Sequence, residues 1–172
     1  LYKVPGKAEI VEGRIQTMSP AGADHGYAAG EIFASLREHA KQTGRGRAVP
    51  DNVGFIVDLP GRRSFSPDAA YYTGPTGGSG FYPAAPDFAV EIRSEEDYGP
   101  AAEARLAKKR QEYFAAGTLV VWDVDLRSKN DIVRVYRNNS TPTGYGRDQV
   151  AEAEPAVPGW TLAVAELFDS AK

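Results

Sequence analysis

The nine residues 86–94, with the sequence PDFAVEIRS, constrain the fold of this chain more than any other segment. They read as a β-strand, in which successive side chains point to opposite faces. The apolar face consists of Phe88, Val90 and Ile92. The opposite face carries Asp87, Ala89, Glu91 and Arg93. Acids within a core-forming strand typically bind a cation or take part in proton chemistry.

Length and composition predict one globular domain spanning residues 1–172. The chain has 172 residues, of which 42% are hydrophobic and 25% charged, which is enough for a real core. No apolar run approaches the ~20 residues that span a bilayer, and residues 1–6 contain no signal-peptide segment. We therefore expect a cytoplasmic protein without a membrane partner. The chain begins at Leu1 rather than methionine, so the sequence leaves open whether terminal segments are missing.

The inventory of metal-binding residues favours oxygen ligands. The chain has no cysteine and two histidines, which excludes thiolate sites and histidine-rich centres. A metal site would therefore bind Mg²⁺ or Mn²⁺. The net charge of -3 argues against a uniformly basic nucleic-acid binder. A local basic patch is still predicted from Arg45, Arg47, Arg62, Arg63 and residues 105–110.

The order of predicted elements indicates a mixed sheet. We expect a hairpin over 8–18, helices over 26–42 and 101–116, a loop over 73–86, a short turn over 166–168, and strands over 54–58, 65–72, 86–94, 119–124, 132–136 and 161–164. The strand–helix–strand order of residues 88–124 is a parallel crossover unit. The predicted fold class is therefore α/β (α+β), a mixed β-sheet flanked by helices on both faces. The apolar strand LVVW, placed at a sheet edge, would support a homodimer.

Several segments in this order resemble a known family. They are EIVEGRIQTMSP, a histidine-containing first helix, SPDAAYY, PDFAVEIRS and KKRQEYFAAGTLVVWDVD. Together, over about residues 8–137, they resemble the Uma-type putative restriction endonuclease family of the PD-(D/E)XK nuclease superfamily. The resemblance implies a restriction endonuclease-like fold. It also implies Mg²⁺-dependent or Mn²⁺-dependent hydrolysis of phosphodiester bonds in DNA, or less readily in RNA.

The resemblance also implies a set of site residues. Asp68 takes the place of the first acid and Glu91 that of the D/E-X-K acid, and the carbonyl of Ile92 completes the metal shell. The usual lysine position holds Arg93, which stays protonated and cannot act as a base. The lysine is instead expected from the next helix as Lys109, with Arg93 contacting a phosphate or holding Glu91.

Three further residues are secondary candidates for this site. Asp87 shares the face of Glu91 but lies ~13 Å away along the strand, so a strand-end contact is expected. His25 could lie near the site, although a contact at the helix start is the better expectation. Glu31 could add a ligand from the first helix. The glycine-rich residues 73–83 are expected to gate the cleft.

Structural explanations stay open for each main residue. Asp68 could be a turn or edge-strand acid, Glu91 an ion-pair partner of Arg93 or a helix lysine, and Lys109 part of a solvated helix face. Three functions therefore remain at this point: a metal-dependent endonuclease, an inactive nuclease-fold protein that binds nucleic acid, and a structural self-associating module.

Overall fold

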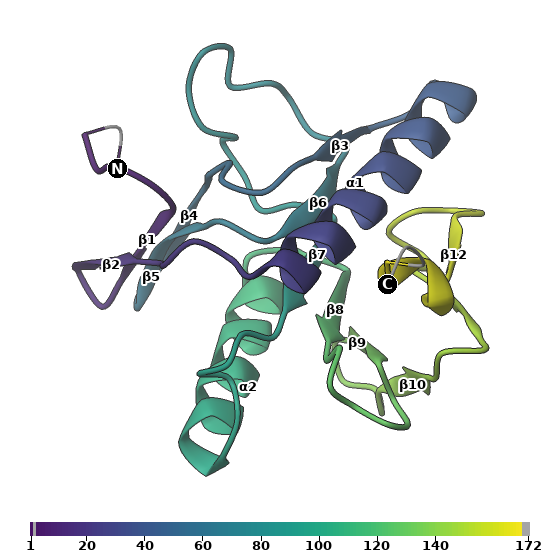
Figure 1. The fold of residues 1–172 in the computed structure, drawn as a ribbon. Helices are drawn as coiled ribbons and strands as arrows, with labels where there is room; N and C mark the ends of the chain where they lie inside the picture. Colours follow the sequence, from purple (N-terminus) through teal and green to yellow (C-terminus); the bar gives the residue numbers. More distant parts are fainter. Residues whose placement is uncertain (2, 170–172) are drawn as a thin grey trace.

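The computed structural model describes residues 1 and 3–169 (Figure 1). Its elements are β1 (Ala8–Val11), β2 (Arg14–Thr17), α1 (Ala23–Thr43), β3 (Arg47–Val49), β4 (Phe55–Leu59), β5 (Arg62–Phe65), β6 (Ala69–Tyr72), β7 (Phe88–Ile92), α2 (Pro100–Ala115), β8 (Val120–Val124), β9 (Val133–Arg137), β10 (Thr143–Tyr145), β11 (Val150–Glu152), β12 (Thr161–Ala163) and the 3₁₀ helix η1 (Val164–Leu167). No helix in this part of the chain is long and apolar enough to cross a membrane.

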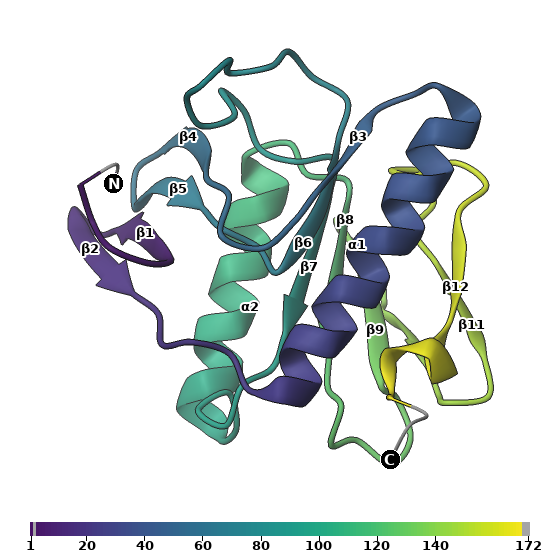
Figure 2. The ribbon, with the colours of Figure 1, turned by 45° about the horizontal axis from the view of Figure 1, so that its top comes forward.

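A six-stranded mixed sheet in the order β10-β9-β8-β7-β6-β3 forms the centre of the molecule. Strands β7 and β8 are parallel and α2 connects them, whereas the other neighbours in this sheet are antiparallel. Helices α1 and α2 lie on opposite sides of the sheet (Figure 2). The predicted α+β class, with its crossover unit and its two flanking helices, is therefore confirmed.

Helix α1 covers one face of the sheet. Its buried residues recur at helical spacing and form a stripe, which consists of Ala28, Ala29, Ile32 and Leu36. This stripe packs on the predicted apolar face of β7. Trp160, from the C-terminal segment, extends the same core, with its ring centroid 5.1 Å from that of Trp122. Gly44, in a left-handed conformation, ends the helix as its sequence position predicts.

The second face of the sheet, which carries the acids of β7, is also a core. Tyr113 of α2 is fully buried there and stacks on Phe65, with ring centroids 3.9 Å apart. Ala89 and Val121 pack beneath the same ring cluster. Parallel neighbours such as β7 and β8 are commonly buried on both faces. The polar side chains near the end of β7 therefore lie at the border of a hydrophobic layer.

The predicted strand over 65–72 is divided into two strands of different sheets. Strand β5 belongs to the four-stranded sheet β2-β1-β5-β4, whereas β6 belongs to the six-stranded sheet. The break contains Pro67, which has no N–H to donate to a sheet ladder. As a result, Asp68 stands at the junction of the two sheets.

Two expectations about surfaces were wrong. The LVVW segment lies in β8, between β7 and β9, so it is not a sheet edge and gives no support for a homodimer. The glycine-rich loop follows the end of β6 and precedes the start of β7. Asp68 precedes β6 and Glu91 lies near the end of β7, so the loop is at the opposite ends of these strands and does not gate them.

Candidate functional site

Asp68 is buried against the end of β7. Its backbone N–H donates to the carbonyl of Val90 over 2.9 Å, and its Oδ2 accepts the N–H of Ile92 over 2.7 Å. These two bonds hold the carboxylate beside the strand residue that follows Glu91. Burial raises the pKa of Asp68, but the hydrogen bond from His25 and the charge of Lys7 lower it more, to well below its ordinary value. Asp68 is therefore ionised and already neutralised by its neighbours.

Glu91 points from β7 toward α2. Its Oε1 accepts a 2.6 Å hydrogen bond from the hydroxyl of Tyr113, a residue without exposed surface. Burial raises the pKa of Glu91, and the charge of Lys109 opposes that shift. Burial and the nearby Glu91 also raise the pKa of Tyr113, so this hydroxyl stays a donor. The pairing fixes the orientation of the Glu91 carboxylate.

Lys109 reaches the site from α2, as its sequence position predicts. Its Nζ lies 2.9 Å from each oxygen of Glu91 and 3.1 Å from Oε1 of Glu9. Burial lowers the pKa of Lys109, but the charges of the two glutamates raise it further, so the amine is protonated. Lys108, its neighbour, is exposed and pairs with Glu12 instead. Of the two lysines, Lys109 alone faces Glu91.

Glu9 of β1 is a site residue that the sequence reasoning missed. Oε1 accepts the N–H of Ser66 over 2.8 Å, and Oε2 accepts Nη1 of Arg62 over 2.6 Å. Burial raises its pKa, but the charges of Lys109 and Arg62 lower it more. The signal was available in the alternation of β1, since Val11 is apolar and lies two residues on, which places Glu9 on the inward face.

Arg62 ties the small sheet to α2 rather than forming a surface patch. Its guanidinium is 6% exposed, and Nε donates to Oε2 of Glu112 over 2.5 Å. Its second contact is the bond to Glu9. Arg62 therefore does not contribute to the predicted basic surface patch, because its guanidinium pairs with the carboxylates of Glu9 and Glu112.

His25 lies in the site, which corrects our expectation of a contact at the helix start. Its Nε2 is 3.0 Å from the carbonyl oxygen of Ile92 and 3.3 Å from Oδ2 of Asp68. The hydrogen bond to Asp68 raises the pKa of the imidazole, while burial opposes this. The first turn of α1 thus places His25 beside the carbonyl oxygen of Ile92 and Oδ2 of Asp68.

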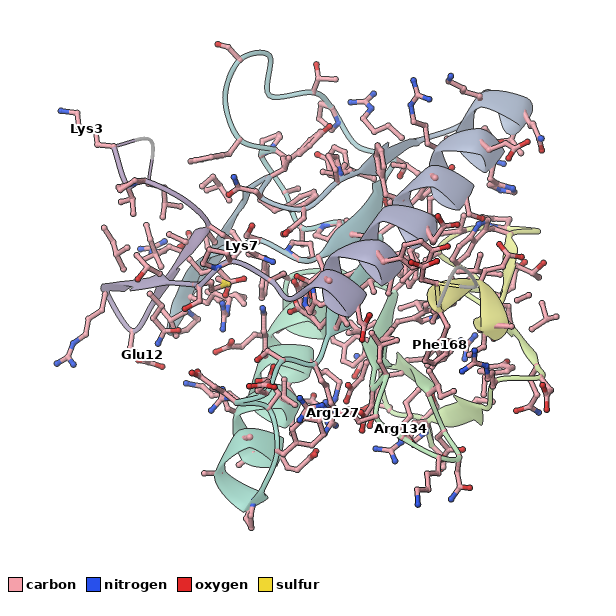
Figure 3. The ribbon with its side chains drawn as sticks, viewed as in Figure 1. Lys3, Lys7, Glu12, Arg127, Arg134 and Phe168 are labelled. Atoms are coloured by element: carbon pink, nitrogen blue, oxygen red, sulfur yellow. The ribbon has the colours of Figure 1, made fainter. Side chains whose placement is uncertain are left out.

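Lys7 is a second residue that the sequence did not reveal. Its Nζ lies 2.6 Å from Oδ1 of Asp68 and 2.7 Å from Oδ1 of Asp51. Burial lowers its pKa, but the charges of Asp68 and Glu91 raise it more, so the ammonium stands within the field of both site acids. Figure 3 shows Lys3 extending outward, whereas Lys7 lies among the side chains near the central strands.

Arg93 neither contacts Glu91 nor faces an open site, contrary to our expectation. Its guanidinium makes two 2.8 Å bonds to Asp123 and also pairs with Glu103. Arg93 and Asp123 are each 4% exposed at the side chain. Asp123 is thus the buried partner of Arg93. This pair joins Arg93, which follows β7, to Asp123 within β8.

The remaining candidates lie away from Asp68. Asp87 accepts hydrogen bonds from the backbone and hydroxyl of Thr73, which is the expected strand-end contact. Glu31 lies one turn along α1 from Tyr27. Burial raises the pKa of Tyr27, and the charges of Glu31, Asp169 and Glu166 raise it further. Among the described residues, Glu31 makes no hydrogen bond or ion pair with Asp68 or Glu91.

The donor set fits a hard divalent cation in chemical type. The carboxylates of Asp68 and Glu91 and the carbonyl of Ile92 are the oxygen ligands that Mg²⁺ and Mn²⁺ accept. No group of three His, Cys, Asp or Glu side chains in the described residues forms a ready metal cluster. The acids are instead neutralised by Lys7 and Lys109. A cation at this place would need to displace the ammonium of Lys7.

Comparisons with known proteins agree with this fold. Residues 2–165 match the family described as "Uma2: Putative restriction endonuclease". A crystal structure of "a putative nuclease belonging to DUF820" from Anabaena variabilis is similar, with a TM-score of 0.76 at 20% identity, covering 97% of this chain and 94% of that one. No curated protein matches the chain. The family match spans nearly the whole sequence, so this chain belongs to the Uma2 family.

Proposed function

We propose that this protein is a divalent-metal-dependent endonuclease that hydrolyses phosphodiester bonds in DNA. Asp68, Glu91 and the carbonyl of Ile92 would hold Mg²⁺ or Mn²⁺. When bound, the ion supplies Lewis-acid stabilisation of the phosphate and lowers the pKa of water. RNA is the second candidate substrate.

The observation that carries this proposal is the placement of Lys109. Three residues from three separate elements, Asp68 before β6, Glu91 in β7 and Lys109 in α2, meet at one end of the central sheet. The lysine of the site comes from helix α2. The position two residues after Glu91, where a lysine is usual, holds Arg93, which pairs with Asp123 instead. The proximity of these residue types supports the proposal despite the departure at Arg93.

Each residue has a distinct task in this proposal. Lys109 is protonated, so it acts as a hydrogen-bond donor that orients water or a phosphate oxygen, and not as a general base. Tyr113 and Lys109 together fix the Glu91 carboxylate. Glu9 holds Lys109 from its other side. These partners already hold Glu91 and Lys109 in place, whereas the ammonium of Lys7 would have to leave Asp68 when the ion binds.

Cleavage of mixed substrates tests the proposal. Random-sequence duplex DNA, single-stranded DNA and RNA would be incubated with Mg²⁺ or Mn²⁺ and each protein. We expect cation-dependent cleavage by the wild type and by Glu95→Gln, whose side chain is 87% exposed. Glu91→Gln should lower the rate at least about 100-fold.

Equal rates in Glu91→Gln and Glu95→Gln would contradict the proposal. Retention of nucleic acid without cleavage, in the presence of bound cation, would favour the inactive binding protein. The cytoplasmic location and the homodimer expected from the sequence stay predictions.

A further inference from the structure

Two buried donor groups without partners lie side by side where β3 begins and β6 ends. Nη1 of Arg47 and the hydroxyl of Tyr72 are both buried, and neither has a hydrogen-bond partner among the described residues. The register of β3 and β6 places Arg47 directly opposite Tyr72. Directly opposed residues of an antiparallel pair point to the same face, so these two side chains are neighbours. Buried donors usually have an acceptor, which suggests that a ligand is missing here.

The hydroxyl of Tyr72 is held in a fixed position. The residue is 1% exposed, and its ring packs between two other aromatic rings. The ring centroids of Phe55 and Tyr82 lie 5.9 and 4.7 Å from its own. Burial and the charge of Asp87 raise the pKa of Tyr72, while the charge of Arg47 opposes them. The hydroxyl therefore keeps its proton at neutral pH and can donate it.

The positive charge of Arg47 is also left without an acceptor at Nη1. Asp87 is close enough for its charge to act on Tyr72, but its Oδ2 accepts the N–H and the hydroxyl of Thr73 over 2.7 and 3.0 Å. A buried charge without a partner is costly. Arg45, exposed just before β3, adds a second positive charge, and the two arginines outweigh the single charge of Asp87.

We propose that Arg47 and the hydroxyl of Tyr72 bind a phosphate anion between β3 and β6. Arginine forms strong, charge-assisted hydrogen bonds with phosphate oxygens, and the tyrosine hydroxyl adds a neutral donor. The phosphate group could belong to a nucleic acid or be free inorganic phosphate, because both present the same oxygens. This inference goes beyond the proposed function, since it assigns a second site that holds no divalent cation.

The glycine-rich loop of residues 73–86 covers this site. A Cβ atom added to Gly74 would lie 2.5 Å from the hydroxyl oxygen of Tyr72, so the loop backbone passes directly over it. The hydroxyl is buried in the unliganded chain, so the loop must move aside before phosphate can enter. Four of these 14 residues are glycine, which eases such a movement.

The site is separate from the acids of the proposed cation site. Asp68 precedes β6 and Tyr72 ends it, so the two residues stand ~13 Å apart along the strand. Phosphate binding at Tyr72 should therefore be measurable without a divalent ion. It should also be unaffected by Glu91→Gln, which separates this inference from the proposed function.

Calorimetric titration of inorganic phosphate in the presence of EDTA tests the inference, with acetate as the control anion. We expect saturable phosphate binding by the wild type, by Glu91→Gln and by Arg63→Met, which removes an arginine that is 60% exposed. Arg47→Met and Tyr72→Phe should each weaken binding at least about 10-fold. Tyr72→Phe keeps the packed ring and removes only the hydroxyl, so it is the variant most certain to fold.

A short single-stranded deoxyoligonucleotide, prepared with and without a 5′-phosphate, identifies the source of the phosphate. Binding of both forms that Tyr72→Phe weakens would assign a backbone phosphate. Binding of the phosphorylated form alone would assign a terminal phosphate, and binding of neither would assign inorganic phosphate.

Equal phosphate affinity in Tyr72→Phe and Arg63→Met, equal binding of acetate and phosphate, or no saturable binding by the wild type would overturn the inference. Urea unfolding without phosphate gives an independent test. Because the hydroxyl has no partner in the unliganded chain, Tyr72→Phe should unfold at the same urea concentration as the wild type or a higher one. A lower midpoint would show that the hydroxyl already has a partner, which would also overturn the inference.

Discussion

Removing the charge of Lys109 should be among the most damaging substitutions in this protein. Lys109→Met keeps the length of the side chain but leaves Glu9 and Glu91 facing each other without their shared cation. Breaking a buried ion pair by removing one partner costs about 3–5 kcal/mol. With a urea m-value of about 2 kcal/mol/M, the unfolding midpoint should fall by roughly 1.5–2.5 M.

Urea unfolding followed by circular dichroism measures this loss, and two further variants identify its cause. Lys108→Met is the matched control on the same helix, because Lys108 is exposed and pairs with Glu12 at the surface, so its midpoint should stay near that of the wild type. Adding Glu91→Gln to Lys109→Met removes one uncompensated charge and should restore at least about 1 kcal/mol. Equal losses in the two lysine variants, or strict additivity in the double variant, would refute the reasoning.

Three further outcomes follow from the geometry. Arg93→Met should lower the free energy of unfolding by about 3–5 kcal/mol in urea titrations, because it strips the main partner from buried Asp123. Burial raises the pKa of Asp97, but hydrogen bonds from a backbone N–H and an arginine lower it more, so its folded pKa is below its ordinary value. Asp97 therefore stabilises the folded protein above its unfolded pKa of about 3.9, and this stabilisation is lost as the pH falls through its folded pKa. The difference in melting temperature between wild type and Asp97→Asn should accordingly be clear at pH 6 and shrink by about pH 2.5. Lys7→Gln should tighten Mn²⁺ binding about 10-fold in calorimetry, because it removes the ammonium that competes for Asp68.

The control for Lys7→Gln is Lys3→Gln. Lys3→Gln removes a charge from the same segment at an exposed position and should leave Mn²⁺ affinity unchanged. Weaker binding in Lys7→Gln would contradict the competition argument. An Arg93→Met protein as stable as the wild type would show that Arg110, 3.4 Å from Asp123, is a sufficient partner. A difference for Asp97→Asn that grows as pH falls would reverse the predicted sign.

The sequence predicted the crossover unit and the residues that it brings together. The parallel pair β7 and β8 needed a connecting helix, and Lys109 shares a face of that helix with Tyr113, four residues on. Glu91 and Lys109 were therefore predictable as neighbours, and the structure places them 2.9 Å apart. Their catalytic roles stay predictions.

What the sequence did not reveal depends on register and on distant contacts. Arg93 meets Asp123 because β7 and β8 pair with Glu91 opposite Asp123, and no local pattern fixes that alignment. Lys7 and Glu9 reach the site through an interface between two sheets. Strands β3, β10 and β11 contain three residues each, too few for a periodic signal.

Calorimetric titration of Mn²⁺ tests the central claim that Asp68 and Glu91 form a divalent-cation site. The wild type would be compared with Glu91→Gln and with the exposed control Glu95→Gln, after circular dichroism has shown that all three are folded. We predict saturable binding of equal affinity in the wild type and Glu95→Gln, and affinity reduced at least about 10-fold in Glu91→Gln. Equal binding in all three proteins, or no binding in the wild type, would contradict the claim.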